Sequence, residues 1–327
     1  MNIQKAGYHG LFFPDLKIAL DGFHPEAELI FVSHAHADHM PRNASAKAVA
    51  TQPTIELMKL RGFRGQSQPA EFVKPVETAR CKITLYPAGH ILGSAMVFIE
   101  SDFGTLLYTG DYRTPPSPVS GGFAAPERVD YLITEATFSL PLYKWKPLHE
   151  LADMIRTFAQ TALKEEFTPV FLGYNLGKAQ EIMHILAPLG HPMMIHGAGY
   201  KLCSVYEKFG YDLGNYSKYD RSHCEGNILI TPTSALSNGF ASNVSKKRIA
   251  YCSGWAALES RQSRFVVDKL IPLSDHLDFF ELIDFCKRLS PKKIFITHTP
   301  NPDVILHYLN EAGLTANFLN VEAQPEV

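Results

Sequence analysis

Short apolar runs separated by turn residues dominate the first third of the chain. The runs 10–14, 17–22 and 29–32, with a turn signal at Asp21-Gly22, are typical of short strands joined in hairpins. A helical spacing of apolar residues appears at 54–60. We expect further strands at 82–86, 95–100, 105–109 and 130–135. A turn at 102–104 predicts that two of these strands form a hairpin.

From about residue 145 to residue 265 the pattern changes to strand, glycine and helix units. Pro169–Tyr174 reads as a strand, and Gly177 then opens a helix with apolar residues at i, i+3, i+4 and i+7. We expect further strands at 193–196, 227–231 and 248–252, and a second helix at 200–209. Strands that alternate with helices predict a small parallel sheet.

The last sixty residues again show the pattern of the first third of the chain. A strand is expected at 265–273, a helix beginning near Phe279, a second strand at 293–297 and a closing helix at 304–312. With 327 residues, the chain is long enough for one elaborated domain or for two.

Composition narrows the class of protein. No apolar run reaches the roughly 18 residues of a membrane span, and no apolar leader follows Met1–Ala6, so we expect a cytoplasmic protein without membrane contact. The five cysteines have no C-x-x-C spacing, which argues against a disulfide framework or a zinc knuckle. A net charge of −2 excludes a globally basic nucleic-acid binder. It does not exclude a nuclease, because two divalent cations would add four positive charges inside one cleft.

Three histidines and one aspartate directly follow the apolar run 29–32, as His34, His36, Asp38 and His39. Each imidazole would need its own hydrogen-bond partner if it were buried without a ligand. Imidazole and carboxylate are ligands of Zn²⁺ and Mn²⁺, so the segment indicates a metal site. A solvated histidine-rich loop is the alternative.

Further metal-ligating or acidic residues stand at or just after predicted strand ends: His90, Asp111, Glu135, His276 and His298. Strand ends in a layered α/β fold meet at one edge, so we expect these side chains to converge there. Asp111 is best interpreted as a carboxylate that bridges two ions.

These motifs resemble those of a known superfamily. The segments 34–39, 88–90 and 109–111, with a late strand-end histidine, resemble the metallo-β-lactamase superfamily. The segments 134–138, 274–279 and 297–298 resemble three extra motifs of its β-CASP nuclease branch. Stretches that are similar to the bacterial DNA ligase-associated exonucleases occur at 87–95, 140–145, 176–180, 195–197 and 253–255.

The resemblance implies an α/β fold in two parts. Residues 1–142 and 266–327 would form an αββα metallo-β-lactamase sandwich. Residues 143–265 would form an inserted β-CASP cap domain, with a small parallel sheet and flanking helices.

The implied function is a metal-dependent phosphodiesterase that works as a DNA exonuclease in DNA repair, and analogy with repair relatives favours 5′ to 3′ digestion of single-stranded DNA. DNA, either single-stranded or at a duplex end, would be the substrate, with a DNA ligase and a helicase of the same repair system as partners. A β-CASP ribonuclease that processes RNA ends is the alternative, because members that act on RNA tend to have a histidine at the position of His298. A small-molecule hydrolase and an inert binding scaffold are less favoured readings.

The resemblance also assigns residue roles. His34, His36 and His90 with Asp111 would hold the first ion, and Asp38, His39, Asp111 and His298 the second, both ions being Zn²⁺ or Mn²⁺. The ions would generate a hydroxide for in-line attack on phosphorus. His276 would act as the general acid and Glu135 would orient it, with Asp38 also counted among the catalytic residues.

Substrate phosphates would contact four residues of the inserted part: Gly177, Lys178, Ser253 and Trp255. Free N–H groups at Gly177 and the neighbouring lysine predict an anion site at this helix start, although a solvated lysine is the alternative. Trp255 could stack on a base or could belong to the core. Short basic groups that could neutralise further phosphates lie at 144–146, at 246–248, and at Arg261 and Arg264.

Overall fold

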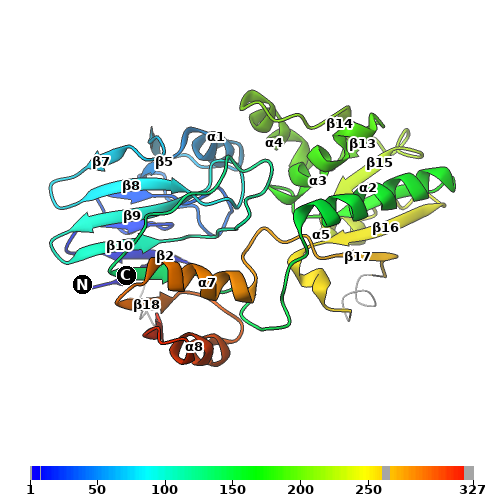
Figure 1. Ribbon diagram of the computed structural model, residues 1–327. Coiled ribbons are helices and arrows are strands. Elements are labelled where there is room, and N and C mark those ends of the chain that lie inside the picture. Colours follow the sequence, from blue (N-terminus) through cyan, green and yellow to red (C-terminus); the bar gives the residue numbers. More distant parts are fainter. Residues whose placement is uncertain (1, 8, 260–265, 320–327) are drawn as a thin grey trace. The chain divides into compact units, whose positions relative to one another are not determined.

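The computed structural model describes residues 2–7, 9–259 and 266–319, and the chain forms two compact units (Figure 1). The first unit is built from the chain up to Pro116, from Ser120–Lys144 and from the chain beginning at His276. The second unit contains Trp145–Asp275 together with Ser117–Val119. The first unit therefore comes from segments at both ends of the sequence.

One sheet of the first unit contains the first six strands in chain order. They are β1 (Gln4–Ala6), β2 (Gly10–Phe13), β3 (Ile18–Leu20), β4 (Leu29–Phe31), β5 (Lys47–Ala50) and β6 (Gln66–Pro69). β1, β2 and β3 pair antiparallel, as hairpins predict. β3 and β4 pair parallel instead, because the loop 21–28 crosses over rather than turning back, so the hairpin expected there is wrong.

The second sheet of this unit has the order β19, β18, β11, β10, β9, β8, β7. Its strands are β7 (Pro75–Glu77), β8 (Lys82–Pro87), β9 (Ala95–Ser101), β10 (Gly104–Tyr108), β11 (Tyr131–Thr134), β18 (Lys293–Ile296) and β19 (Ala316–Phe318). β9 and β10 form the predicted hairpin, and Ser101 pairs with Gly104. β10, β11 and β18 are parallel neighbours, and β8 runs in their direction because both β8 and β10 are antiparallel to β9. These four strands therefore end at the same edge of the sheet.

Apolar side chains fill both faces of the second sheet. Leu106 and Ile133 belong to a buried cluster shared with Leu20 and Phe31 of the first sheet, so the two sheets pack face to face. Leu107, which points the opposite way along its strand, belongs to a second cluster with residues of α7 (Phe279–Leu289) and α8 (Pro302–Glu311). α1 (Gln52–Leu60) links the parallel strands β5 and β6 of the first sheet. Two packed sheets with flanking helices are consistent with a metallo-β-lactamase-type fold.

The second unit contains a separate, entirely parallel sheet with the order β14, β13, β15, β12, β16, β17. The strands are β12 (Thr168–Leu172), β13 (Met193–Ile195), β14 (Tyr216–Lys218), β15 (Ile228–Thr231), β16 (Lys247–Cys252) and β17 (Lys269–Ile271). Every residue of β12 and β15 is buried, as is typical of strands covered on both faces. The α-helices among the described residues of this unit are α2 (Leu148–Lys164), α3 (Lys178–Leu186), α4 (Gly197–Lys208) and α5 (Thr233–Ser237).

Sequence patterns missed or misplaced several elements. The 17-residue helix α2 was not predicted, because alanines such as Ala152, Ala159 and Ala162 make up much of its buried face and give a weak apolar signal. The strand expected at 265–273 is wrong in extent, since β17 covers only Lys269–Ile271 and Phe265 lies outside the described residues. The edge strands β6 and β7 escaped prediction because their residues are largely exposed.

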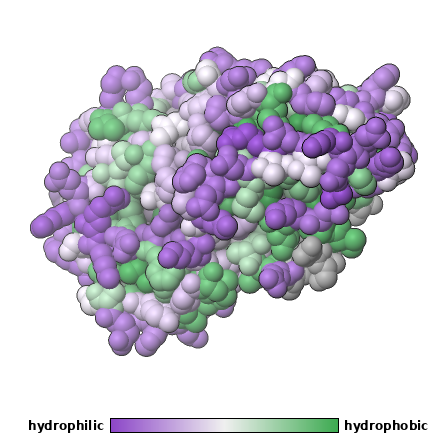
Figure 2. All heavy atoms as spheres, turned by 45° about the vertical axis from the view of Figure 1, so that its right-hand side comes forward, coloured by the Kyte–Doolittle hydropathy of each residue, from purple (hydrophilic) through white to green (hydrophobic). Residues whose placement is uncertain are grey.

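Among the described residues, no helix combines the length and the apolar character that crossing a membrane requires. Hydrophilic and hydrophobic residues are interspersed over the face of the molecule in Figure 2. Such a mixture is ordinary for the surface of a globular protein.

Gly110→Ala tests how the fold brings the strand ends together. Gly110 has a φ of 53°, and a Cβ there would lie 2.6 Å from both Cβ and Oγ of Ser33. We expect the free energy of unfolding to fall by about 1 to 3 kcal/mol in a urea titration, because Ser33 is packed and cannot move away. Gly313→Ala is the matched control, since Gly313 has a φ of 78° and its Cβ would meet nothing within 4 Å. Equal losses in the two variants would contradict this packing argument.

Candidate metal centre

His34, His36 and His39 are buried in the segment that follows β4. Two backbone hydrogen bonds fix the start of this segment. Val32 N–H donates to the carbonyl of Val49 in the first sheet at 2.9 Å, and Ala95 N–H of the second sheet donates to the carbonyl of Ser33 at 2.8 Å. The histidine segment is therefore held where the two sheets meet.

Four other predicted residues follow strands of the second sheet. His90 comes after β8, Asp111 after β10, Glu135 after β11 and His298 after β18. Because these strands end at one edge, their side chains converge there, as predicted. His276 arrives differently: it precedes the N-terminus of α7, so its expected place at the end of a strand is wrong.

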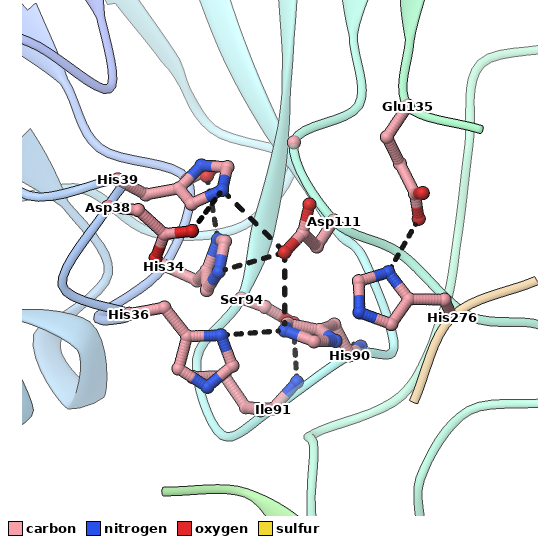
Figure 3. Close-up of polar contacts among 12 residues, drawn as sticks. His34, His36, Asp38, His39, His90, Ile91, Ser94, Asp111, Glu135 and His276 are labelled. Carbon is pink, nitrogen blue, oxygen red and sulfur yellow. Dashed lines mark hydrogen bonds and ion pairs between the residues drawn. The ribbon is translucent and has the colours of Figure 1, made fainter. Parts of the chain in front are cut away.

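The carboxylate of Asp111 lies at the centre of the converging imidazoles (Figure 3). Its Oδ2 is 3.4 Å from Nε2 of His34, 3.6 Å from Nε2 of His39 and 3.8 Å from Nε2 of His90. Its Oδ1 is 3.9 Å from Nε2 of His298. Four histidines from three separate segments thus direct the same ring nitrogen at one carboxylate.

These separations suit a metal ion better than hydrogen bonds. Hydrogen bonds between nitrogen and oxygen span about 2.7 to 3.2 Å, whereas two ligands of a common ion, each about 2.0 to 2.2 Å from it, lie further apart. Within the described part of the chain, His34 Nε2 and Asp111 Oδ1 are buried and have no hydrogen-bond partner. Such atoms carry a desolvation penalty that a cation would remove. The residues present therefore fit a divalent metal ion.

The two predicted ligand sets differ in compactness. The ligand atoms of His34, His36, His90 and Asp111 all lie within 4.8 Å of one another, and all four residues are buried. The second set is more open: the side chains of Asp38 and His298 are 49% and 32% exposed. Asp38 Oδ2 lies 4.0 Å from Nε2 of His39. The open half is the side from which solvent can reach the cluster.

Asp21, which the sequence pattern indicated only as a turn residue, is a buried carboxylate behind the histidines. Its oxygens accept hydrogen bonds from the N–H and hydroxyl of Ser33 at 2.6 and 2.5 Å and from the hydroxyl of Tyr108 at 2.8 Å. His39 Nδ1 lies 2.8 Å from Asp21 Oδ2 and donates to it, which leaves Nε2 of His39 for a ligand. Asp21 and His34 also lie near enough to share an ion, but these donors occupy the lone pairs of Asp21. No sequence motif marks this residue.

Ser33 orients the first histidine in the same way. Its hydroxyl proton is directed at Asp21, so its oxygen accepts a hydrogen bond from Nδ1 of His34, 2.9 Å away. This places the ring proton of His34 on Nδ1 and leaves Nε2, the atom facing Asp111, as a free lone pair. On the opposite side of the cluster, the backbone N–H of His90 donates to the hydroxyl of Ser94 at 3.1 Å. This hydrogen bond fixes the loop that carries His90.

The ionisable groups of the cluster shift one another's pKa values. Burial, reinforced by the charge of His39, holds the pKa of His34 well below its ordinary value. Burial alone would raise the pKa of Asp111, but the charges of His39 and His276 hold it well below its ordinary value. Burial opposes protonation of His39, yet Asp111 and Asp21 raise its pKa to about 9. An ionised Asp111 is the state that a cation requires, and metal binding at His39 would release a proton.

Glu135 and His276 form a contact beside the cluster. Nδ1 of His276 lies 2.8 Å from Oε1 of Glu135, and the second carboxylate oxygen accepts the N–H of Thr137 at 2.8 Å. Glu135 is buried, which raises the pKa of its carboxyl, but the charge of His276 outweighs burial and lowers that pKa. An ionised carboxylate thus holds one nitrogen of the imidazole and leaves Nε2 on the other side of the ring (Figure 3).

The N-terminus of α7 positions His276. Asp278 caps this helix by accepting the N–H groups of Phe280 and Glu281, and Glu281 accepts the N–H of Asp278 at 2.9 Å. The N–H of Leu277 donates to the carbonyl of Tyr112 at 3.1 Å. The backbone that carries His276 is therefore tied to the residue next to Asp111.

The residues predicted to contact phosphate lie in the second unit. Lys178 and Ser253 line a cavity of about 180 Å³ there. Lys178 is only 3% exposed, and its Nζ lies 2.8 Å from Glu181, so a solvated surface lysine is excluded. The free N–H expected at Gly177 is wrong, because it donates to the side chain of Gln180 at 2.8 Å. Trp255 packs against an apolar cluster of this unit.

The short basic groups are partly neutralised by carboxylates. Arg248 is paired with Glu165, and Nζ of Lys246 lies 3.8 Å from Glu166. Lys146 is paired with Glu150 at 3.8 Å. Arg261 and Arg264 lie outside the described residues.

Asp21→Asn tests the buried carboxylate behind the histidines. The variant keeps the size of the side chain, but its NH₂ group would face N–H and O–H groups that now donate to the carboxylate. We therefore expect the free energy of unfolding to fall by about 1 to 3 kcal/mol. The affinity for a divalent cation should fall about 10- to 100-fold, because His39 loses its partner. Urea titration and calorimetric metal titration measure the two effects. The control is Asp15→Asn in the exposed turn between β2 and β3, and a metal affinity of Asp21→Asn equal to that of this control would refute the role.

Comparison with known proteins finds relatives that match much of the chain. No family model matches the sequence. A protein named probable DNA ligase from Opitutus terrae is 33% identical over 325 residues, which cover 98% of this chain and 31% of that protein. The 5′ exonuclease Apollo of Gallus gallus is 26% identical over 312 residues, covering 86% of this chain and 62% of Apollo. An RNase J-like protein of Methanocaldococcus jannaschii is 30% identical over 188 residues, covering 49% of this chain and 43% of that protein.

The chain therefore spans less than two thirds of the length of each of these relatives. The family to which these relatives belong is consistent with the buried cluster of histidines and aspartate and with the layered sheets that carry it. The chain belongs to the metallo-β-lactamase superfamily and, within it, to the β-CASP branch.

Proposed function

We propose that this chain is a metal-dependent nuclease, a phosphodiesterase that acts as a DNA exonuclease in DNA repair. The observation that carries the proposal is the group of imidazoles around Asp111, with the contact between Glu135 and His276 beside it. Phosphodiester cleavage needs a place for cations and a proton donor for the leaving oxygen, and this arrangement offers both.

The ligand chemistry suits two ions, for which we propose Zn²⁺, Mn²⁺ or one of each. His34, His36, His90 and Asp111 would hold the first ion, and Asp38, His39, Asp111 and His298 the second. Bound cations would activate water and neutralise charge on the phosphate oxygens. The chain itself contributes the orientation of each imidazole, through Asp21 and Ser33, and the burial that keeps competing water away from the first ligand set.

His276 is proposed as the general acid. With Nδ1 held by Glu135 at 2.8 Å, its Nε2 is the atom that can donate a proton to the leaving oxygen. The ionised carboxylate stabilises positive charge on the ring, so the proton is present when it is needed. Glu135 acts as a positioning residue in this scheme.

DNA is the proposed substrate because a similarity that extends over nearly the whole chain favours it. The relative that matches 98% of this chain is named a probable DNA ligase and is about three times as long as the matched region. A DNA ligase is therefore the partner we propose, while a helicase stays a prediction from the resemblance. Apollo is named a 5′ exonuclease, which supports digestion from 5′ to 3′.

A β-CASP ribonuclease is the second candidate, favoured by a specific residue. His298, which RNA-acting members tend to share, lies 3.9 Å from Asp111. Relatives named RNase J-like protein and endoribonuclease ysh1 also match parts of the chain. These matches cover 49% of this chain, which is why we place RNA second.

We propose that the second unit contains the β-CASP cap, for which the resemblance gave the bounds 143–265. Its parallel sheet with flanking helices supports the assignment. The cavity beside Lys178 and Ser253 is the place where we propose that substrate phosphate is held, with Gly177 and Trp255 nearby in the sequence.

His276→Ala tests the assignment of the acid. We expect the variant to retain its bound metal and to lose activity by about 10²- to 10⁴-fold on a labelled oligonucleotide, since only proton transfer is removed. Asp111→Ala should lose metal as well as activity, because it removes the carboxylate shared by both ligand sets. Metal content by elemental analysis and initial rates give the two readouts.

The matched control is His307→Ala, which removes an exposed imidazole from α8 of the same unit. It should retain both metal and activity. Cleavage by His276→Ala at the wild-type rate would show that another group protonates the leaving oxygen.

Digestion of single-stranded DNA and RNA of one sequence tests the substrate. We expect DNA to be cleaved faster at matched salt, and an oligonucleotide labelled at its 5′ end to release the label in the first products. Each reaction is run with Zn²⁺ and with Mn²⁺ after removal of metal by a chelator. Faster cleavage of RNA would reverse the order of the two candidates, and early release of a 3′ label would reverse the polarity.

A further inference from the structure

His9 lies beside the open half of the metal centre, although no motif of the sequence marks it. Its Nε2 is 3.7 Å from Oδ2 of Asp38. Its ring lies 5.1 Å from the ring of His298 and 5.6 Å from that of His39, measured between centroids. The side chain is 28% exposed, which is close to the exposure of His298. His9 is thus adjacent to Asp38, His39 and His298 of the second ligand set.

The separation of His9 and Asp38 resembles that of the ligand pairs already described. Nitrogen and oxygen atoms of the pairs that involve Asp111 lie 3.4 to 3.9 Å apart, and the 3.7 Å between His9 and Asp38 falls within this range. A hydrogen bond would bring the two atoms to about 3 Å. The distance is that of an ion pair, and it also allows both atoms to be ligands of one ion.

The backbone on one side of His9 is closely packed. A Cβ at Gly10 would lie 2.1 Å from the carbonyl oxygen of Ala6 and 2.5 Å from Cα of Gly22. Only a glycine permits this approach, so the backbone at Gly10, the residue after His9, lies directly against Gly22. Gly22 follows Asp21, the carboxylate that holds His39. The same segment therefore positions both His39 and His9.

We propose that His9 is an additional ligand of the second ion, together with Asp38, His39, Asp111 and His298. This inference rests on the metal centre of the proposed function. Five protein ligands exceed the four positions of a tetrahedral zinc site. His9 therefore favours an ion that accepts five or six ligands, such as Mn²⁺, in the second position.

Calorimetric titration of the metal-free full chain with MnCl₂ and with ZnCl₂ tests the proposal without substrate. We expect His9→Ala to bind the more weakly held Mn²⁺ about tenfold or more less tightly than the wild type. Zn²⁺ should be affected less, so the variant shifts the preference towards Zn²⁺. The control is His307→Ala, whose affinities should equal those of the wild type.

Two further variants separate ligation from packing. His9→Phe keeps a ring beside His298 but has no ligand atom, so it should lose Mn²⁺ affinity as His9→Ala does. His9→Glu supplies an oxygen ligand and should recover part of that affinity. Melting of the metal-free variants, followed by circular dichroism, should match the wild type, because His9 lies in a partly exposed turn.

The outcomes distinguish this inference from the function on which it rests. If the wild type binds no ion at all, the metal centre and His9 fail together. If the wild type binds two ions and His9→Ala or His9→Phe binds them with unchanged affinity, only the role of His9 is overturned. A rise in the KM for DNA at unchanged metal affinity would likewise overturn it and would make His9 a substrate contact.

Discussion

The carboxylate of Asp111 is the point on which the site depends. It is buried, and imidazole nitrogens of His34, His39, His90 and His298 face it at 3.4 to 3.9 Å. A desolvated carboxylate among imidazoles is costly unless cations or protons balance it. The parallel ends of β8, β10, β11 and β18 satisfy the geometric part of this requirement, because they deliver their following residues to one edge. The electrostatic part is what a pair of divalent ions would supply.

The two halves of the centre differ in a way that bears on function. The half around His34, His36 and His90 is enclosed. Hydrogen bonds with the hydroxyls of Ser33 and Ser94 fix His34 and the backbone of His90. The half around Asp38 and His298 is partly open to solvent. A closed half suits retention of an ion, and an open half suits access for a phosphodiester. His9 lies on the open side, where an added ligand would change ion preference without closing the site.

Sequence reasoning reached the family and the convergent residues because both depend on local signals. Each of His90, Asp111, Glu135 and His298 follows an apolar run, and the run predicts a strand whose end fixes the position of the residue. Asp21 and His9 gave no such signal. Asp21 looks like any Asp-Gly turn until the fold places Ser33 and Tyr108 around it, and the place of His9 depends on the packing of Gly10 against Gly22. The helix α2 was missed for a related reason, since alanines on its buried face depend on neighbours for their burial.

Anomalous diffraction from crystals grown with Mn²⁺ or Zn²⁺ tests the central claim most directly. The account predicts two peaks about 3.5 to 4 Å apart, each within bonding distance of the Asp111 carboxylate. The enclosed peak would be bonded to imidazoles of His34, His36 and His90, and the other would lie on the side of Asp38 and His298. Peaks at other places in the chain, or none beside Asp111 at saturating metal, would contradict the account.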